Sequence, residues 1–162
     1  MNDIDIRYSE MEDIEPLRKW LQDPECLKWF PIYTPQEVED YTKNWIGFSR
    51  FRASLTASLE GKPCGVATLF LMPYRKVAHH AMFVLLVDPG QKGKGVGTSL
   101  VKNILNLGKN YFCLESLHIE VYEGSPIIPI LQHFQFVCYA TQNRYVKWEK
   151  EYLTRTLWQS PK

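Results

Sequence analysis

The sequence predicts a mixed α/β fold, in which a largely antiparallel sheet carries helices on both faces. Three observations lead to this class. Runs of alternating apolar and polar residues recur along the chain and predict strands, and segments with apolar residues at helical spacing lie between them. The run Ala78–Val87 becomes wholly apolar in its second half, which is typical of a strand covered on both faces. The predicted order is β-α-α-β-β-β-α-β-α-β-β, an antiparallel meander that leads into one central β-α-β unit.

Length and composition restrict the possible classes of protein. The 162 residues suffice for one domain, which we expect over residues 1–162. Lys and Arg number 19 and Asp and Glu 18, and this net charge of +1 argues against a protein that coats nucleic acid or an anionic membrane. The longest apolar run, Ala81–Val87, is far shorter than the roughly 20 residues of a membrane-spanning helix. Four cysteines without a CxxC pair, and an N-terminus without a signal peptide, predict a cytoplasmic protein with reduced thiols.

The first predicted elements are a strand and two helices. Ile4–Tyr8 alternates apolar and polar residues and predicts the strand. Ser9 and Glu12 stand three positions apart, as in the capping box that begins a helix. The apolar residues of this first helix are Leu17, Trp20 and Leu21.

A second helix is predicted from about Pro35 to Phe48. Thr34 would be its N-cap and Pro35 its first residue, a position where the missing N–H of proline costs nothing. The apolar face of this helix comprises Val38, Tyr41, Trp45 and Phe48.

Three strands follow. Ser54–Leu59 and Val66–Leu71 are joined by the turn Glu60–Pro63 and predict a hairpin. The third strand, Ala78–Val87, ends at the breaker Asp88–Gly90. The remaining predicted elements are a helix over Gly97–Leu107, a strand over Leu117–Tyr122, a short helix over Ile127–Phe134, and strands from Phe136 and from Tyr152 around a turn near Glu149–Lys150.

The glycine-rich stretch that leads into the predicted helix Gly97–Leu107 has the features of an anion site. Gly93, Gly95 and Gly97 allow the backbone to turn sharply and to approach a ligand closely. The helix that begins there offers free N–H groups and the positive end of its dipole, for which phosphate is the usual ligand. Lys92 and Lys94 add positive charge at the rim.

Two familiar phosphate loops do not match this stretch. Gly90 and Gly95 have the spacing of a Walker loop, but Val96 stands where the phosphate-binding lysine is needed. A dinucleotide fingerprint that begins at Gly93 requires glycine where Thr98 stands. A tight turn that binds nothing is a poor explanation for three alternating glycines, since an interior glycine costs stability.

The stretch Val84–Thr98 resembles the acetyl-CoA signature of the GCN5-related N-acetyltransferase (GNAT) family. That signature is an apolar strand that ends near a proline, followed by Arg/Gln-x-x-Gly-x-Gly/Ala at the start of a helix. Lys92 stands at the Arg/Gln position, a departure that keeps a donor, and Gly95 and Gly97 stand at the glycine positions. The predicted element order is similar to that of the family over essentially the whole chain.

The resemblance implies a GNAT-like acyl-CoA N-acyltransferase fold with a V-shaped opening between the strand that ends at Val87 and the strand Leu117–Tyr122. Acetyl-CoA would be the co-substrate, and no metal is implied. The pantetheine arm would bind like an added strand, and the pyrophosphate would rest on backbone amides. The implied binding residues are Leu85, Leu86 and Val87 for the arm, and Lys92, Gly93, Lys94, Gly95, Val96, Gly97 and Thr98 for the phosphates.

One carboxylate is the candidate base. The segment Leu117–Val121 is similar to the Leu-x-Leu-Glu-Val strand of the family's N-terminal-amine acetyltransferases, whose proposed base falls on Glu120. Strand alternation puts Glu120 on the same face as His118 and Tyr122. The alternative is that Glu120 merely ends a polar strand face. His79 or His80 on the preceding strand would be substitute bases, unless they are ordinary surface residues.

The acid of the family has no clear counterpart. The tyrosine that normally protonates the CoA sulfur falls on Leu131 or Gln132, and Gln135 replaces the glycine before Phe136. The thiolate would then be protonated by water or by Tyr122, a weak candidate acid, or it would leave without being protonated.

The acceptor would enter opposite CoA, between the segment Trp20–Phe48 and the C-terminal strands. Aromatic and acidic side chains together suit a cationic amine, although core packing and a solvated face are their ordinary explanations. In this segment they are Trp20, Trp29, Phe30, Tyr33, Tyr41, Trp45, Asp23, Glu25, Glu37, Glu39 and Asp40.

The sequence therefore predicts an acetyl-CoA-dependent N-acetyltransferase that acts by direct attack of a primary amine. The acceptor would be a small molecule or a peptide: a protein N-terminus, a polyamine or an aminoglycoside. We expect a monomer or homodimer that binds neither nucleic acid nor membrane. The alternatives are a catalytically impaired CoA-binding module and a nucleotide-binding switch domain, against which the missing Walker lysine argues.

Overall fold

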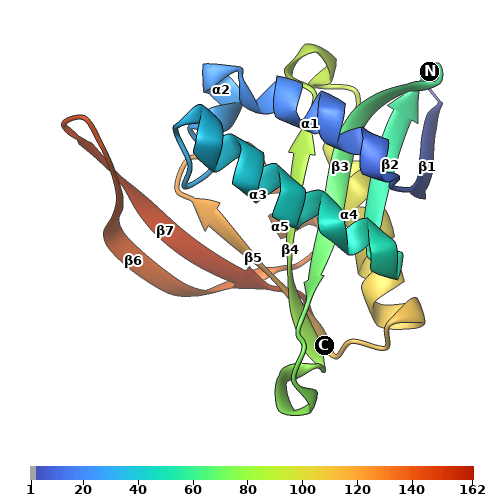
Figure 1. Cartoon of the computed structure of the whole chain (residues 1–162). Coiled ribbons are helices and arrows are strands. Elements are labelled where there is room, and N and C mark those ends of the chain that lie inside the picture. Colours follow the sequence, from blue (N-terminus) through green and yellow to red (C-terminus); the bar gives the residue numbers. More distant parts are fainter. Residues whose placement is uncertain (1–2) are drawn as a thin grey trace.

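A computed structural model describes residues 3–162 of the chain as one seven-stranded sheet with helices on both faces (Figure 1). The strand order is β1-β2-β3-β4-β5-β7-β6, and every neighbouring pair except the parallel β4–β5 is antiparallel. The predicted fold class is thereby confirmed. The elements are β1 (Ile4–Tyr8), α1 (Ile14–Leu21), α2 (Pro24–Leu27), α3 (Pro35–Gly47), β2 (Ser54–Leu59), β3 (Lys62–Leu71), β4 (His80–Val87), α4 (Val96–Asn106), β5 (Ser116–Tyr122), α5 (Ile128–His133), β6 (Val137–Trp148) and β7 (Glu151–Gln159).

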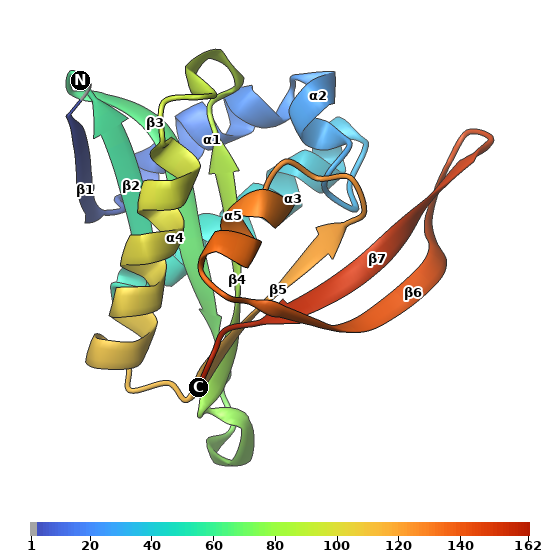
Figure 2. The same cartoon turned by 180° about the vertical axis from the view of Figure 1, so that it is seen from behind.

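The two faces of the sheet are covered by different helices. Helices α1 and α3 lie on the face seen in Figure 1, and α4 and α5 lie on the opposite face, seen in Figure 2. Helix α4 buries Leu100 and Ile104 in one core cluster, while Trp45 of α3 lies in the other. Strands β3 and β4 contribute to both clusters, as the apolar run of β4 predicts.

The start of α1 differs from the prediction. Ser9 is buried in the sheet, where its hydroxyl lies 2.8 Å from those of Thr56 and Ser54, so it does not cap the helix. Asp13 takes the role expected of Glu12, and its Oδ2 accepts a hydrogen bond of 2.8 Å from the Glu10 amide. Because Met11–Asp13 form a 3₁₀ turn, α1 begins only at Ile14.

The cap of α3 follows the sequence closely. The Glu37 amide donates to Thr34 Oγ1 over 3.1 Å, and the Thr34 amide donates to Glu37 Oε1 over 2.8 Å, which completes a capping box. Pro35 occupies the first turn, as predicted. The helix ends at Gly47 rather than Phe48, because a 3₁₀ turn begins there.

The β2–β3 hairpin has a shorter turn than predicted. Leu59 pairs with Lys62, so Lys62 and Pro63 belong to β3, and only Glu60 and Gly61 make the turn. Their φ angles of 52° and 79° are both positive, as a type I′ turn requires. At its other end, β4 begins at His80 rather than Ala78, because Arg75–Val77 form a 3₁₀ turn.

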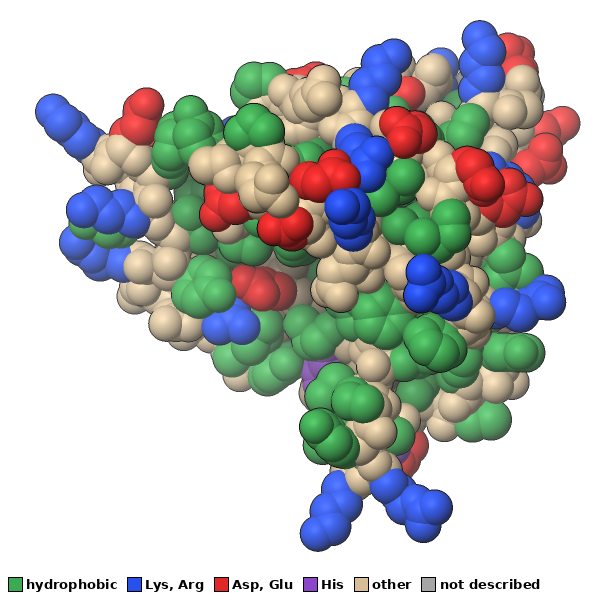
Figure 3. All heavy atoms as spheres, in the orientation of Figure 1, with side chains coloured by type: hydrophobic (Ala, Val, Ile, Leu, Met, Phe, Trp, Pro, Cys, Tyr) green, Lys and Arg blue, Asp and Glu red, His purple; other side chains and the backbone are tan. Residues whose placement is uncertain are grey.

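The β6–β7 hairpin projects from the sheet and bends back toward the helices. Its strands meet at the predicted turn Glu149–Lys150. The ring centroids of Trp148 in β6 and Tyr33 before α3 lie 4.0 Å apart, which joins the end of the hairpin to the helical layer. In the space-filling view, the surface is hollowed between the hairpin and the helices (Figure 3).

Candidate active site

Strands β4 and β5 separate and leave an opening at the centre of the sheet. Their pairing is limited to His80–Met82 with residues 116–118. Both strands continue, β4 to Val87 and β5 to Tyr122, but they diverge (Figure 2). A cleft of about 430 Å³ fills the gap between their ends. The V-shaped opening implied by the resemblance is therefore present.

The glycine loop closes one end of this cleft. Gly93 and Gly95 have φ angles of 81° and 83°, a left-handed conformation that suits glycine. Helix α4 begins at Val96, one residue earlier than predicted, and its first-turn residues Val96, Gly97 and Thr98 line the cleft. The N–H groups of a first turn have no acceptor within the helix, so this end of the cleft is suited to an anion.

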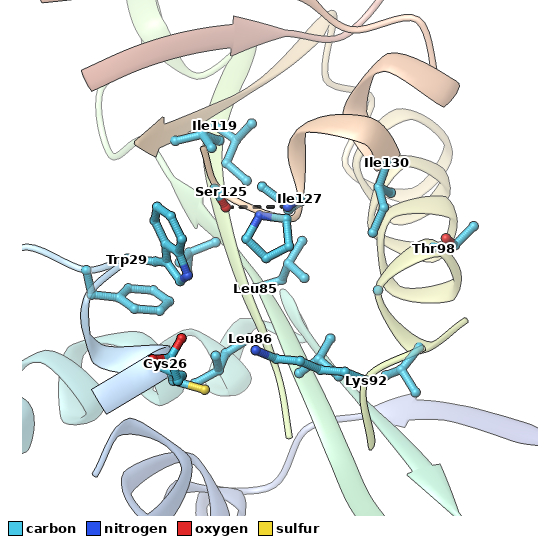
Figure 4. A pocket seen from close by; sticks show the side chains of 18 of the residues that line it. Cys26, Trp29, Leu85, Leu86, Lys92, Thr98, Ile119, Ser125, Ile127 and Ile130 are labelled. Atoms are coloured by element: carbon cyan, nitrogen blue, oxygen red, sulfur yellow. Dashed lines mark hydrogen bonds between the residues drawn. The ribbon is translucent and has the colours of Figure 1, made fainter. Parts of the chain in front are cut away.

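The two loop lysines differ in position. Lys92 lines the cleft, and its ammonium points toward Cys26 and Leu86 (Figure 4). Burial raises the pKa of the Cys26 thiol, and the charge of Lys92 partly offsets this. Lys94 does not line the cleft; its Nζ makes an exposed hydrogen bond of 2.7 Å to Oε1 of Gln91, a residue at the edge of the lining. The structure thus brings Lys92 to the expected site and leaves Lys94 outside it.

The β4 wall of the cleft presents backbone as well as side chains. Leu85, Leu86 and Val87 line the cleft, as the resemblance implies. Within residues 3–162, β4 has no strand partner on its β5 side beyond Met82. Such an edge can bind an extended, amide-bearing chain by strand addition.

Glu120 stands in the opposite wall. It lines the cleft and lies on the sheet face of His118 and Tyr122, as predicted. Its Oε1 lies 3.2 Å from Nε of Arg155 on β7, and each side chain is 28% exposed. Burial raises the pKa of the Glu120 carboxyl, an effect that Arg155 partly opposes. Its role as a base stays a prediction.

Tyr122 also lines the cleft but is nearly fully buried. Its hydroxyl finds no hydrogen-bond partner among the described residues. Burial, together with the charge of Glu120, raises the pKa of Tyr122 far above its usual value. The same two causes raise the pKa of the neighbouring Tyr41 to about 12. Both phenols are therefore neutral hydrogen-bond donors at physiological pH.

The two candidate histidines lie elsewhere. His79 and His80 stand at the start of β4, and neither lines the cleft. His80 contacts the rings of His79 and His118 at centroid distances of 4.8 and 5.3 Å. The geometry gives no support to either residue as a substitute base.

Helix α5 presents different residues from those that the family pattern indicates. Leu131 is fully buried in the core and Gln132 is exposed, and neither lines the cleft. Ile127 and Ile130 face the cleft instead (Figure 4). Gln135, which replaces the glycine of the pattern, has a φ of 64°.

The acidic residues of the Trp20–Phe48 segment are mostly structural. Glu25 lines the cleft. Asp23 caps α2, Glu37 caps α3, and Glu39 pairs with Arg18 and Lys43. Asp23, Glu37 and Glu39 therefore have structural roles outside the cleft, and only Glu25 among these acids is placed to meet an acceptor.

The aromatic residues of the same segment divide between core and cleft. Trp20 and Trp45 are core residues, whereas Trp29 and Phe30 line the cleft. Cys26 lies in the four-residue helix α2 and Trp29 follows shortly after its end, and no sequence motif marks either residue as part of the cleft. In residues 3–162 no cluster of acidic, His and Cys side chains is arranged to hold a metal ion, and no helix is long and apolar enough to cross a membrane.

Comparisons with known proteins agree with this geometry. The family model described as "Acetyltransferase (GNAT) family" matches residues 14–126. The L-amino acid N-acetyltransferase AaaT of Escherichia coli (strain K12) is 22% identical over 154 residues, which cover 94% of both chains.

Two solved structures share the fold. The ribosomal-protein-alanine N-acetyltransferase from Brucella melitensis superposes with a TM-score of 0.79 at 18% identity, over 96% of this chain and 98% of its own. The structure of yncA from Salmonella typhimurium with its cofactor acetyl-CoA gives a TM-score of 0.78 at 14% identity, over 96% and 92%.

Proposed function

This chain belongs to the GNAT acetyltransferase family, and on that premise we propose that it acetylates the α-amino group of a small, amino-acid-like acceptor. It is an N-acetyltransferase, and acetyl-CoA is its acetyl donor. The observation that carries the proposal is the position of Glu120, a half-buried carboxylate in the cleft wall opposite β4. The choice of acceptor is supported by the likeness to an L-amino acid N-acetyltransferase over 94% of both chains.

The cofactor would lie between the glycine loop and the edge of β4. The amides from Gly93 to Thr98 and the ammonium of Lys92 are suited to the pyrophosphate, and Leu85–Val87 to the pantetheine amides. Acetyl-CoA supplies an activated acetyl group. The residues present fit this ligand, because the left-handed glycines and the unpaired strand edge both leave backbone groups free.

Glu120 would accept the proton of the attacking amine. An amine is mostly protonated at neutral pH and must lose that proton before it can attack. Burial raises the pKa of Glu120, which makes its carboxylate a stronger base than that of an exposed glutamate.

Tyr122 would act as a hydrogen-bond donor rather than as an acid. Its pKa lies far above the value near 8.5 of a thiol, so transfer of its proton to a thiolate is unfavourable. Its unpartnered hydroxyl can instead stabilise the leaving sulfur, and water can supply the proton.

A CoA-binding module without catalysis is the second candidate, and the absence of a phenol on the cleft side of α5 favours it. Release of free thiol from acetyl-CoA separates the two. The acceptors to test are the twenty common L-amino acids, spermidine, kanamycin and a peptide with a free N-terminus, with products weighed by mass spectrometry. We expect thiol release with one or more amino acids. CoA binding without thiol release from any acceptor would favour the module.

A further inference from the structure

We propose that Arg155 recognises a carboxylate of the acceptor, so that the Glu120–Arg155 pair selects molecules that carry an amine and a carboxylate side by side. The proposal deepens the proposed function and rests on it. It distinguishes amino acids from polyamines, aminoglycosides and protein N-termini, none of which carries a free carboxylate next to the amine that is acetylated.

The position of Arg155 in the sheet puts it on the acceptor side of the site. Arg155 of β7 pairs directly with Tyr122 of β5, so both side chains lie on the face that carries Glu120. The cofactor gap lies between β4 and β5, and β7 lies on the other side of β5. Viewed from the glycine loop, Arg155 is therefore beyond Glu120, on the strand that forms the hairpin with β6.

The guanidinium of Arg155 is held in place by its neighbours, but not all of its hydrogen-bond donors have an acceptor. Its Nη1 donates to Gln142 Oε1 over 3.3 Å, and its Cζ lies 4.5 Å from the ring centroid of Tyr145. Nη2 makes no hydrogen bond to any described residue. A planar fork that is oriented by packing and has a free donor is suited to a carboxylate.

Three buried polar atoms without hydrogen bonds meet at this place. They are Glu120 Oε1, Tyr122 Oη and Arg155 Nε, the first and last in ionic contact at 3.2 Å but poorly aligned. Folded proteins satisfy most buried polar atoms, so unsatisfied ones require an explanation. Glu120 and Tyr122 line the cleft, and Arg155 lies beside them on the adjacent strand β7. Three such atoms on two adjacent strands fit a site that a polar ligand completes.

A zwitterion has the charge pattern that this pair needs. An amino acid would place its ammonium group beside Glu120 and its carboxylate beside Arg155. Each charge of the ion pair then has two neighbours of opposite charge, one from the protein and one from the ligand. An acceptor without the carboxylate brings a second cation near Arg155 and leaves Nη2 unpaired. Because the site is half-buried, an unpaired donor lowers affinity more than it would in water.

The test compares each amino acid with its carboxamide, which keeps the amine and the side chain but removes the negative charge. For the wild type we expect kcat/KM to be about 10- to 100-fold higher for the acid, the range for hydrogen bonds to charged groups. Arg155→Gln is expected to remove this preference, chiefly through KM of the acid, and Arg155→Lys to restore part of it. Arg144→Gln removes one positive charge from the same hairpin, where Arg144 stacks on Tyr152, and is expected to keep the preference.

Binding separates failure of this proposal from failure of the proposed function. Calorimetric titration of the twenty amino acids and their carboxamides into the protein saturated with CoA measures recognition without turnover. Tighter binding of the acids, lost in Arg155→Gln, supports carboxylate recognition even if no acceptor is acetylated. Equal handling of acids and carboxamides, an unchanged preference in Arg155→Gln, or no binding of any amino acid would overturn it. Equal acetylation of amino acids and their carboxamides would overturn carboxylate recognition and leave the proposed function standing.

Discussion

Met82 of β4 and His118 of β5 are the last paired residues of the two central strands, and the cleft opens directly beyond them. The divergence exposes the backbone edge of β4 on one side and Glu120 on the other. Because the strands are parallel, the same end of the sheet also receives the first turn of α4, which brings the glycine loop to this gap.

Lys92 is expected to contribute to CoA binding and Lys94 is not. Lys92→Gln removes a charge that lines the cleft and should weaken CoA binding about 3- to 10-fold at low salt, with a smaller effect at high salt. Lys94→Gln is the matched control, because Lys94 does not line the cleft and its ammonium makes an exposed hydrogen bond to Gln91. Calorimetric titration with CoA measures both. Equal losses in the two variants would mean that only the net charge of the loop matters.

Glu120→Gln is expected to lower turnover about 10²- to 10⁴-fold, the usual contribution of a general base, and to leave CoA affinity unchanged. Higher pH should partly rescue the variant, because more of the amine is then neutral. In the wild type, activity should fall as the pH drops through the raised pKa of Glu120, where the carboxylate becomes protonated. Glu123→Gln, an exposed neighbour, is the control. Wild-type turnover of Glu120→Gln from pH 6 to 9 would make Glu120 a structural residue.

Leu131→Tyr is expected not to supply the missing phenol. Leu131 is fully buried, so the larger side chain should lower the free energy of unfolding by about 1–3 kcal/mol through overpacking. CoA affinity of the folded protein should stay the same. Ile130→Tyr, one residue earlier, changes the lining of the cleft and is expected to alter CoA affinity or turnover. Chemical denaturation measures the loss of stability, and calorimetric titration measures the CoA affinity of both variants. Higher turnover in Leu131→Tyr would contradict the prediction and show that this side chain reaches the cleft.

Asp13 is expected to stabilise the fold in a pH-dependent way. Burial raises the pKa of its carboxyl, but hydrogen bonds from Arg7, at 2.8 and 2.9 Å, from the Glu10 amide and from Thr56 together hold it below its usual value. Asp13→Ala should cost about 2–4 kcal/mol at pH 7, less than for a fully buried pair because Arg7 is 40% exposed.

The pH dependence of this effect follows from the lowered pKa. The stabilisation by Asp13 is complete above the pKa of the unfolded chain and is lost as pH falls through the lower pKa of the folded state. Urea unfolding between pH 7 and pH 2 should therefore show the difference between wild type and Asp13→Ala shrink. Glu15→Ala removes an ion pair whose glutamate is 74% exposed, and it is expected to cost less than about 1 kcal/mol at any pH. A difference for Asp13→Ala that persists at pH 2 would contradict the electrostatic explanation.

Gln135→Gly is expected to stabilise the protein. Gln135 follows α5 with a φ of 64°, which is strained for a residue with a Cβ atom. Glycine at this position should raise the free energy of unfolding by about 0.5–1 kcal/mol. Gln132→Gly, inside α5, should lower it by about as much. Thermal unfolding measures the pair, and a lower Tm for Gln135→Gly would show that the glutamine side chain makes a contact that outweighs the strain.

Local chemistry in the sequence was sufficient to predict most elements and the cofactor end of the site. The Thr34–Glu37 cap, the alternation of β1 and the glycines before α4 depend on interactions between residues a few positions apart, so the sequence pattern contains their cause. Strand alternation likewise put Glu120 on the face of Tyr122. What the alternation could not indicate was the partner of Glu120, because Arg155 reaches it only through the register of β5 with β7.

Tertiary packing decided the details that differ from the predictions. Ser9 bonds to Thr56 in the sheet, and Asp13 accepts the capping hydrogen bond instead. In α5, Leu131 is buried in the core and Ile130 lines the cleft. Lys92 and Lys94 both add charge to the loop in the sequence, with Lys92 at the Arg/Gln position of the signature, and in the structure only Lys92 lines the cleft. In each case two nearby residues have similar chemistry, so the local sequence does not separate them. Contacts with segments distant in the sequence make the choice, since only they differ between the two.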